Sequence, residues 1–210
     1  LHIKDMLTLI EVDKESVEFL NSEFQKEKLN IIEADFLKFD IGLNYQSEKD
    51  ILIIGNFPYN ISSQILFKTI DNYKSVSGLI GMFQKEVAER IISKNNCKQY
   101  GILSVKTQLF YDTKILFNVS PNVFFPKPKV DSAVILLTRK KNLTIDCDLD
   151  LLDKVIKLSF QQRRKKIKNS LKRLVIQENL LEDSIFESIP EQLTIKEFVK
   201  LTKKISDETI

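Results

Sequence analysis

The sequence predicts an α/β fold, a doubly wound parallel sheet followed by a small all-helical domain, from three observations. Short apolar runs alternate with amphipathic stretches through the first two-thirds of the chain, as in repeated βαβ units. After a change in composition at 139–148, the apolar periodicity is helical. A chain of 210 residues is long enough for one substantial core and a small satellite domain. We therefore expect two domains, at 1–140 and 146–210.

The elements of the first domain follow in order from the apolar pattern. A strand at 7–12 leads into an amphipathic helix from Lys14 to about Lys26. Further strands are expected at 30–34, 50–55, 76–83, 114–119 and 130–138, and helices at 62–70, 85–93 and 102–110. The strand at 50–55 is purely apolar, as a parallel strand covered on both faces should be. Ser62 or Ser63 could cap the helix that begins there. The last two strands could pair as a hairpin.

The second domain is expected to contain only helices, because its apolar residues recur at helical spacing. These residues are Leu152, Val155, Ile156 and Phe160, then Ile167, Leu171 and Leu174, then Ile195, Phe198 and Val199.

Composition excludes several classes of function. With 43% hydrophobic and 29% charged residues, the chain is an ordinary soluble globular protein, and a net charge of +3 is too small to indicate a partner. Cys97 and Cys147 are isolated, which argues against a disulfide framework or zinc ribbon. His2 is the only histidine, which argues against catalysis by histidine and against a metal site. Without a membrane span or signal-peptide pattern, we expect a cytoplasmic protein with no membrane partner.

The most informative motif follows the strand at 50–55 and consists of Asn56, Phe57, Pro58 and Tyr59. This ending places an amide, a fixed turn and an aromatic face at the carboxyl edge of a sheet, where open α/β sheets bind ligands. The Asn56 side chain and a backbone carbonyl near Phe57 could each accept a hydrogen bond from a planar amine such as adenine N6. Such bonds favour a localised lone pair and fix its direction. The alternative interpretation is a plain Asn-x-Pro turn.

Two carboxylates are expected at the ends of the first two strands. Glu11 closes the first, where doubly wound folds place an acid for a ribose diol, and Asp35 follows the second, where it could accept a bond from an adenine amino group. Strand-end carboxylates are also common as helix caps or solvated loop residues. Together with Asn56, they give polar groups at three successive strand ends.

A proline-rich loop at 121–128 contains Phe124 and Phe125. Its prolines restrict the backbone, so an aromatic side chain there could be held out as a second stacking wall. We expect one of the two phenylalanines to be in the core and Phe124 to be the exposed one.

The segment 161–173 carries seven cations and no acid. Such runs are often solvated faces, but this local imbalance favours a phosphate-binding patch for folded RNA. The residues expected to bind RNA are Arg163, Arg164, Lys165, Lys166 and Lys168.

Six segments together resemble one family. They are 9–13 (LIEVD), 55–62 (GNFPYNIS), 84–87 (QKEV), 100–105 (YGILSV), 124–132 (FFPKPKVDS) and 160–165 (FQQRRK). They are similar to the KsgA-type small-subunit rRNA adenine-N6 dimethyltransferases, which use S-adenosylmethionine, and the similarity spans most of the chain.

This resemblance implies a Rossmann-like class I methyltransferase sheet and methyl transfer to N6 of two adjacent adenosines in the 3′-terminal hairpin of 16S rRNA. It implies that Glu11, Asp35 and Asn56 bind the cofactor, with Glu11 at its ribose and Asp35 at its adenine. It also implies that Tyr59 and Phe124 sandwich a flipped target base. Phe57 stands where the family often has leucine. The implied partner is 16S rRNA within the assembling 30S subunit, and we expect a monomer with a role in subunit biogenesis.

One departure concerns the start of the chain. The family's glycine-rich first strand, loop and helix have no counterpart here, and a strand is expected within a few residues of Leu1. We expect that this sequence lacks the first strand of the sheet, an N-terminal part of about 50 residues or more, and that the 210-residue form binds S-adenosylmethionine poorly. The alternative is a short edge strand that opens a complete domain.

Two alternative functions remain open. One is a 23S rRNA adenine methyltransferase of the erythromycin-resistance type, which shares the Asn-x-Pro-Tyr motif. The other is a non-catalytic RNA-binding assembly factor, a class that includes the related mitochondrial transcription factors. Retention of Asn56, Pro58 and Tyr59 favours catalysis.

Overall fold

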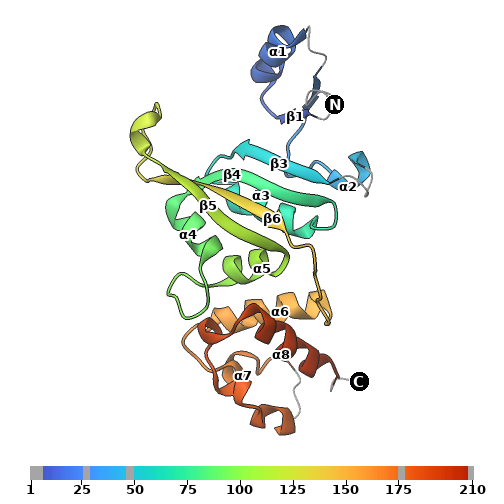
Figure 1. Cartoon of the computed structure of the whole chain (residues 1–210), viewed down its shortest axis with the longest axis vertical. Helices are drawn as coiled ribbons and strands as arrows, with labels where there is room; N and C mark the ends of the chain where they lie inside the picture. Colours follow the sequence, from blue (N-terminus) through green and yellow to red (C-terminus); the bar gives the residue numbers. More distant parts are fainter. Residues whose placement is uncertain (1–6, 26–28, 46–49, 175–177, 208–210) are drawn as a thin grey trace.

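The computed structural model describes residues 7–25, 29–45, 50–174 and 178–207 and is elongated (Figure 1). Its N-terminal end is a small parallel unit of β1 (Thr8–Glu11), α1 (Lys14–Glu23) and β2 (Asn30–Glu33). β1 and β2 pair in parallel with Glu11 opposite Glu33, so the carboxyl ends of both strands meet at one edge. Asp13 caps α1 by accepting a hydrogen bond from the Ser16 amide at 2.8 Å. The expected helix end near Lys26 lies outside the described residues.

A four-stranded sheet forms the centre of the molecule (Figure 1). Its order is β3 (Ile51–Asn56), β4 (Val76–Gln84), β6 (Ser132–Arg139) and β5 (Tyr111–Val119). β3 and β4 are parallel, whereas β4–β6 and β5–β6 are antiparallel, which confirms the expected hairpin of the last two strands. The short helix α2 (Ile41–Asn44) precedes β3, and Asp40 caps it.

Three helices contact this sheet: α3 (Ser62–Asp71), α4 (Lys85–Ile92) and α5 (Ile102–Phe110). Their buried residues, such as Leu66, Ile91 and Val105, join Leu79 of β4 in the core. The expected serine cap of α3 is wrong, because Ile61 occupies the cap position and no side chain caps the helix there. The Ser62 hydroxyl instead donates to the Tyr59 carbonyl at 3.0 Å and ties the helix to the preceding turn.

Three details of the sheet differ from the sequence-based expectation. Among the described strands, β1 and β2 form a sheet separate from the other four, and the larger sheet is mixed rather than fully parallel. β3 was expected to be covered on both faces, but Leu52 and Ile54 are 48% and 68% exposed while Ile53 is buried. The apolar run therefore correctly indicated a strand, but the side chains on one face of that strand are exposed in the described part of the molecule.

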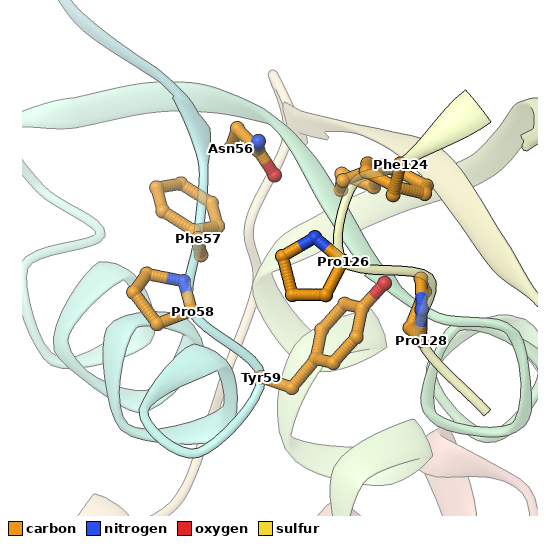
Figure 2. A pocket seen from close by; sticks show the side chains of 8 residues that line it. Asn56, Phe57, Pro58, Tyr59, Phe124, Pro126 and Pro128 are labelled. Carbon is orange, nitrogen blue, oxygen red and sulfur yellow. The ribbon is translucent and has the colours of Figure 1, made fainter. Parts of the chain in front are cut away.

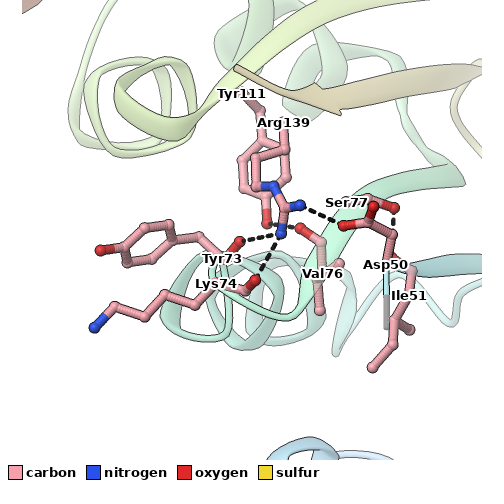
Figure 3. A network of polar contacts seen from close by, with 8 residues as sticks. All are labelled: Asp50, Ile51, Tyr73, Lys74, Val76, Ser77, Tyr111 and Arg139. Carbon is pink, nitrogen blue, oxygen red and sulfur yellow. Dashed lines mark hydrogen bonds and ion pairs between the residues drawn. The ribbon is translucent and has the colours of Figure 1, made fainter. Parts of the chain in front are cut away.

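At the amino end of β3, a polar network fixes the sheet (Figure 3). The Arg139 guanidinium donates to the carbonyls of Tyr73 and Lys74, at 3.1 and 2.7 Å, and pairs with Asp50. The buried Tyr111 hydroxyl donates to the Val76 carbonyl at 3.0 Å, and burial raises the pKa of this phenol above its ordinary value. This network lies at the end of β3 opposite to Asn56 and secures the strands whose other ends carry the motif.

The chain beyond 148 forms the other end of the molecule and contains α6 (Leu149–Gln161), α7 (Ile167–Ser170) and α8 (Ile195–Asp207) (Figure 1). Within the described residues the 3-10 turns include η3 (Pro121–Val123), η4 (Glu178–Glu182), η5 (Ser184–Glu187) and η6 (Pro190–Gln192). No helix within the described ranges is long and apolar enough to span a membrane.

The helical end is fixed to the sheet part by apolar and polar contacts. Leu152 and Phe198 belong to the same core cluster as the sheet residues. Between α5 and α6, the Lys106 ammonium lies 2.7 Å from an Asp153 oxygen, with the lysine side chain only 17% exposed. The Tyr100 hydroxyl donates to the Leu193 carbonyl at 2.9 Å. These contacts hold the cationic segment at a defined position relative to the sheet.

Candidate active site

The turn after β3 is anchored by the Phe57 ring. This side chain is only 9% exposed and lies over two glycines on neighbouring strands, Gly55 and Gly81. A Cβ atom at either glycine would fall 2.3 Å from a ring carbon, so the ring fills space that any larger residue would occupy. Its edge contacts Phe83, with ring centroids 5.8 Å apart. Because Phe57 points into the core, its contribution to a ligand site would come from its backbone carbonyl.

A pocket of about 320 Å³ opens beside this turn (Figure 2). It is lined by Asn56, Phe57, Pro58, Tyr59, Met82, Phe124, Pro126 and Pro128. The volume is at the small end of the usual range for ligand pockets, roughly 300–1,000 Å³, and the lining is largely apolar and aromatic. The structure thus brings all five residues predicted to be catalytic into one cavity, although 65 residues separate Tyr59 and Phe124 in the chain.

Asn56 supplies the amide in this pocket. It is exposed at the end of β3, and its side chain extends toward the space in front of Phe124 (Figure 2). Within the described chain the Asn56 amide has no hydrogen-bond partner, so its oxygen is available to an incoming amine. The backbone below it is fixed by the pairing of Asn56 with Met82 on β4.

Tyr59 forms an aromatic wall and is held by its hydroxyl. The phenol oxygen lies 2.5 Å from the Ser132 hydroxyl, which is fully buried at the start of β6. Next to it, the Lys85 amide donates to the Asp131 carbonyl at 2.9 Å and fixes the strand entry to the β4–α4 junction. The Tyr59–Ser132 hydrogen bond joins the Asn56–Tyr59 motif to the segment that carries Phe124.

The two phenylalanines of the loop are placed differently from the expectation. Neither belongs to the core among the described residues. Phe124 is half-buried and lines the pocket, as its proposed role requires, whereas Phe125 is fully exposed at 103%. The prediction that Phe124 would be the exposed residue and the other would be core is therefore wrong.

Glu11 and Asp35 lie outside this pocket. Both are half-buried at the carboxyl edge of the β1–β2 unit, where the Ala34 amide donates to the Glu11 carbonyl at 2.9 Å. Glu11 Oε1 accepts from the amides of Val12 and Asp13, and Asp35 Oδ1 accepts from the amide of Leu37 at 2.9 Å. A carboxylate has about four lone-pair positions, so both can accept further bonds, as a ribose hydroxyl or an adenine amine requires.

The cationic segment is partly neutralised. Arg163 pairs with Glu191 at 3.1 Å and donates to the carbonyls of Cys97 and Lys98, which makes it a bridge between the two parts of the molecule. Lys166 and Lys168 both pair with Glu187, and their hydrogen bonds lower the pKa of that carboxyl to about 2. Arg164 and Lys165 are exposed, and neither side chain has a partner in the described part of the chain.

Three lining residues and one supporting residue were not assigned to the site from the sequence. From the sequence, Pro126 and Pro128 were expected only to stiffen the loop and Met82 only to lie in a strand, yet all three line the pocket. Ser132 holds Tyr59. Met82 could have been found by pairing the carboxyl ends of the two parallel strands, because it lies opposite Asn56.

Comparisons with known proteins identify the family. Residues 2–205 match the family model described as ribosomal RNA adenine dimethylase. A protein of Flavobacterium johnsoniae named ribosomal RNA small subunit methyltransferase A is 52% identical over 202 residues, which cover 96% of this chain and 77% of the relative. A protein of the same name from Bacteroides thetaiotaomicron is 44% identical over 97% of this chain and 77% of its own length.

Solved structures agree on the fold. A dimethyladenosine transferase from Plasmodium falciparum superposes with a TM-score of 0.82 at 24% identity, covering 97% of this chain and 82% of that one. The 23S rRNA methyltransferase ErmE gives a TM-score of 0.69 at 20% identity, covering 95% and 81%. These likenesses confirm the Rossmann-like methyltransferase fold with a helical C-terminal part. With the family model spanning nearly the whole sequence, the chain belongs to the ribosomal RNA adenine dimethylase family.

Proposed function

We propose that this protein transfers methyl groups from S-adenosylmethionine to N6 of two adjacent adenosines in the 3′-terminal hairpin of 16S rRNA. The proposed substrate is the assembling 30S subunit in the cytoplasm, and the protein acts as a monomer. The observation that carries the proposal is the pocket, in which an unpartnered amide, a fixed turn and two aromatic walls converge. The relatives with 42–52% identity are named for the small subunit, which favours this substrate over 23S rRNA.

In this mechanism the chain's own residues hold and activate a weak nucleophile. Tyr59 and Phe124 stack on the two faces of a flipped adenine. The Asn56 amide oxygen and the Phe57 backbone carbonyl accept the two N–H bonds of the exocyclic amine, so that its lone pair is localised and directed at the methyl donor. The pocket lining includes no carboxylate or imidazole, and the acidic proton of the methylated amine is lost to water.

The residues at the β1–β2 edge fit the polar groups of the cofactor. Glu11 would accept hydrogen bonds from the ribose hydroxyls and Asp35 one from the adenine amine, using the oxygen lone pairs that the local turns leave free. S-adenosylmethionine supplies the electrophilic methyl group when bound.

The experiment that tests the catalytic assignment compares two asparagines of the same turn. Asn56→Ala removes the amine acceptor and should lower kcat about 10²- to 10³-fold, the usual effect of deleting one preorganised hydrogen-bonding group. Asn60→Ala is the matched control, because Asn60 is also exposed but does not line the pocket. Methyl transfer is measured on small subunits from a strain that lacks the modification, with the protein expressed from its full reading frame. Equal activity of the two variants would contradict the role of Asn56.

We further propose that the cationic segment binds rRNA phosphates, with Arg164 and Lys165 as its main contacts. Arg163, Lys166 and Lys168 contribute less to phosphate binding, because each is already paired with a glutamate. Replacing Arg164 and Lys165 with Gln should weaken subunit binding and reduce the slope of log affinity against log salt by about 0.7–0.9 for each lost phosphate contact. An unchanged slope would contradict this assignment.

A further inference from the structure

Phe125 is the most exposed of the large apolar side chains that the structure describes, at 103%. It lies between two residues that line the pocket, Phe124 and Pro126, yet it lines nothing itself. No ring contact or packing partner involves it in the described chain. A phenylalanine ring stabilises a fold by being buried, so a ring left wholly in water contributes nothing of this kind to stability.

The backbone that carries this ring is held in place on both sides. At the turn η3, the Phe124 amide donates to the Pro121 carbonyl and the Val123 amide donates to the Ser120 carbonyl, each at 3.3 Å. After the loop, the Lys85 amide binds the Asp131 carbonyl. Prolines at 121, 126 and 128 fix φ at three further points. The ring is therefore presented from a stiff segment, which lowers the entropy lost when a ligand stacks on it.

The position of the ring follows from its two neighbours. Phe124 and Pro126 both line the pocket, whereas Phe125 between them does not. The chain bends at 124–126, and the Phe125 side chain is left fully exposed. The ring is therefore presented to solvent beside the pocket.

The loop that carries the ring also carries two lysines. Lys127 and Lys129 are both exposed, and neither forms an ion pair in the part of the chain that is described. The acid of this segment, Asp131, lies at the strand entry. An aromatic ring next to exposed lysines is the pattern of single-stranded nucleic-acid binding, in which bases stack on rings and cations follow the phosphates.

We propose that Phe125 stacks on the nucleobase adjacent to the target adenosine, while Lys127 and Lys129 contact the phosphates that flank it. This inference rests on the proposed function and extends its RNA contact from one base to two. Phe124, Pro126 and Pro128 line the pocket, so one path for a strand whose target base is flipped between Tyr59 and Phe124 runs over this loop. The neighbouring base then meets the face of the loop on which Phe125 is presented.

The test uses a short single-stranded RNA with 2-aminopurine next to the target adenosine, because stacking quenches its fluorescence. Phe125→Ala should weaken binding at least about fivefold, the lower limit for loss of one stacked base, and should abolish the quenching, whereas Phe125→Trp should retain both. Phe117→Ala is the control, because Phe117 is also exposed, at 57%, but lies in β5 rather than in the loop that lines the pocket. The salt slope should stay constant in Phe125→Ala and fall in Lys127→Ala.

Two results would overturn the inference. One is that Phe125→Ala binds the RNA and quenches its fluorescence normally. The other is that Phe117→Ala loses as much RNA affinity as Phe125→Ala, which would indicate a general apolar contact, such as one made to a protein partner. A methyl-transfer assay of the protein without substitutions separates the two proposals. If this protein transfers methyl groups and the Phe125→Ala variant has an unchanged KM for RNA, only this inference fails. If the protein without substitutions transfers no methyl groups, the proposed function fails.

Discussion

Gly81→Ala tests whether the Phe57 ring sets the position of the catalytic turn. A Cβ atom at Gly81 would lie 2.3 Å from Phe57 Cε2 and 3.1 Å from Phe83 Cε2. Ordinary contact begins at 3.4 Å, so the Phe57 ring must move by about 1 Å. It has little room to move along the sheet toward β3, because the ring also lies over the Gly55 backbone, where an added Cβ would likewise fall 2.3 Å from a ring carbon. The ring must therefore lift away from the sheet and take the Asn56–Tyr59 turn with it.

The expected cost has two parts. Overpacking of this kind destabilises a protein by about 1–3 kcal/mol, offset by about 0.5–1 kcal/mol from replacing a strand glycine, so we expect a net loss of up to about 2.5 kcal/mol in the free energy of unfolding. A displacement of about 1 Å at the turn should lower the rate of methyl transfer about 10²-fold. Urea unfolding measures the first quantity and methyl incorporation into small-subunit rRNA the second.

A second substitution makes the reasoning refutable. Phe57→Leu removes the ring atoms that the new methyl group meets, so adding it to Gly81→Ala should restore most of the activity. Gly42→Ala is the control, because its nearest neighbour would be at the ordinary distance of 3.4 Å and alanine favours the helix there. If Gly81→Ala and the double variant lose activity equally, the steric account is wrong.

Three further predictions concern contacts around the site and between the two parts of the molecule. Tyr59→Phe and Ser132→Ala each break the same hydrogen bond, so their effects on KM and kcat should be non-additive in a double-mutant cycle; additive losses would show that the two hydroxyls act separately. Arg163→Ala should lower the free energy of unfolding by about 1 kcal/mol and speed hydrogen exchange in the segment around Cys97, where unchanged exchange would contradict the bridging role. The Glu187 carboxyl has a folded pKa of about 2 against an ordinary value of 4.5, so its contribution to stability is present above pH 4.5 and is lost as the pH falls toward 2. The stability difference between the unmodified protein and Glu187→Gln should shrink over that interval, and a constant difference would contradict the pairing.

Much of the fold follows from local sequence because the apolar pattern is local. The apolar run before Asn56 indicated β3, and the expected hairpin of the last two strands is present with Ile115 opposite Ile135. The grouping of Asn56 with Tyr59 also followed, because residues at one strand end share an edge of the sheet. The pocket itself needed long-range contacts, since Phe124 reaches it only through a loop whose entry into β6 is tied to Tyr59 and Lys85.

What the sequence did not predict depends on partners distant in the chain. Whether Phe124 or Phe125 faces the pocket depends on how the loop bends at 124–126, which apolar content does not reveal. The neutralisation of Lys166 and Lys168 comes from Glu187, about 20 residues further along, so the cation-rich run alone overstated the free charge. The exposed face of β3 depends on what lies beside the strand rather than on the strand's own residues.

The most direct test of the central claim is the methylation state of rRNA. Ribosomal subunits that lack the modification are incubated with S-adenosylmethionine and the protein expressed from its full reading frame, and the digested rRNA is analysed by mass spectrometry. We expect N6,N6-dimethyladenosine at two adjacent positions in the 3′-terminal hairpin of 16S rRNA, and none with Asn56→Ala. Dimethyladenosine that appeared only in 23S rRNA, or in neither RNA, would contradict the proposed function.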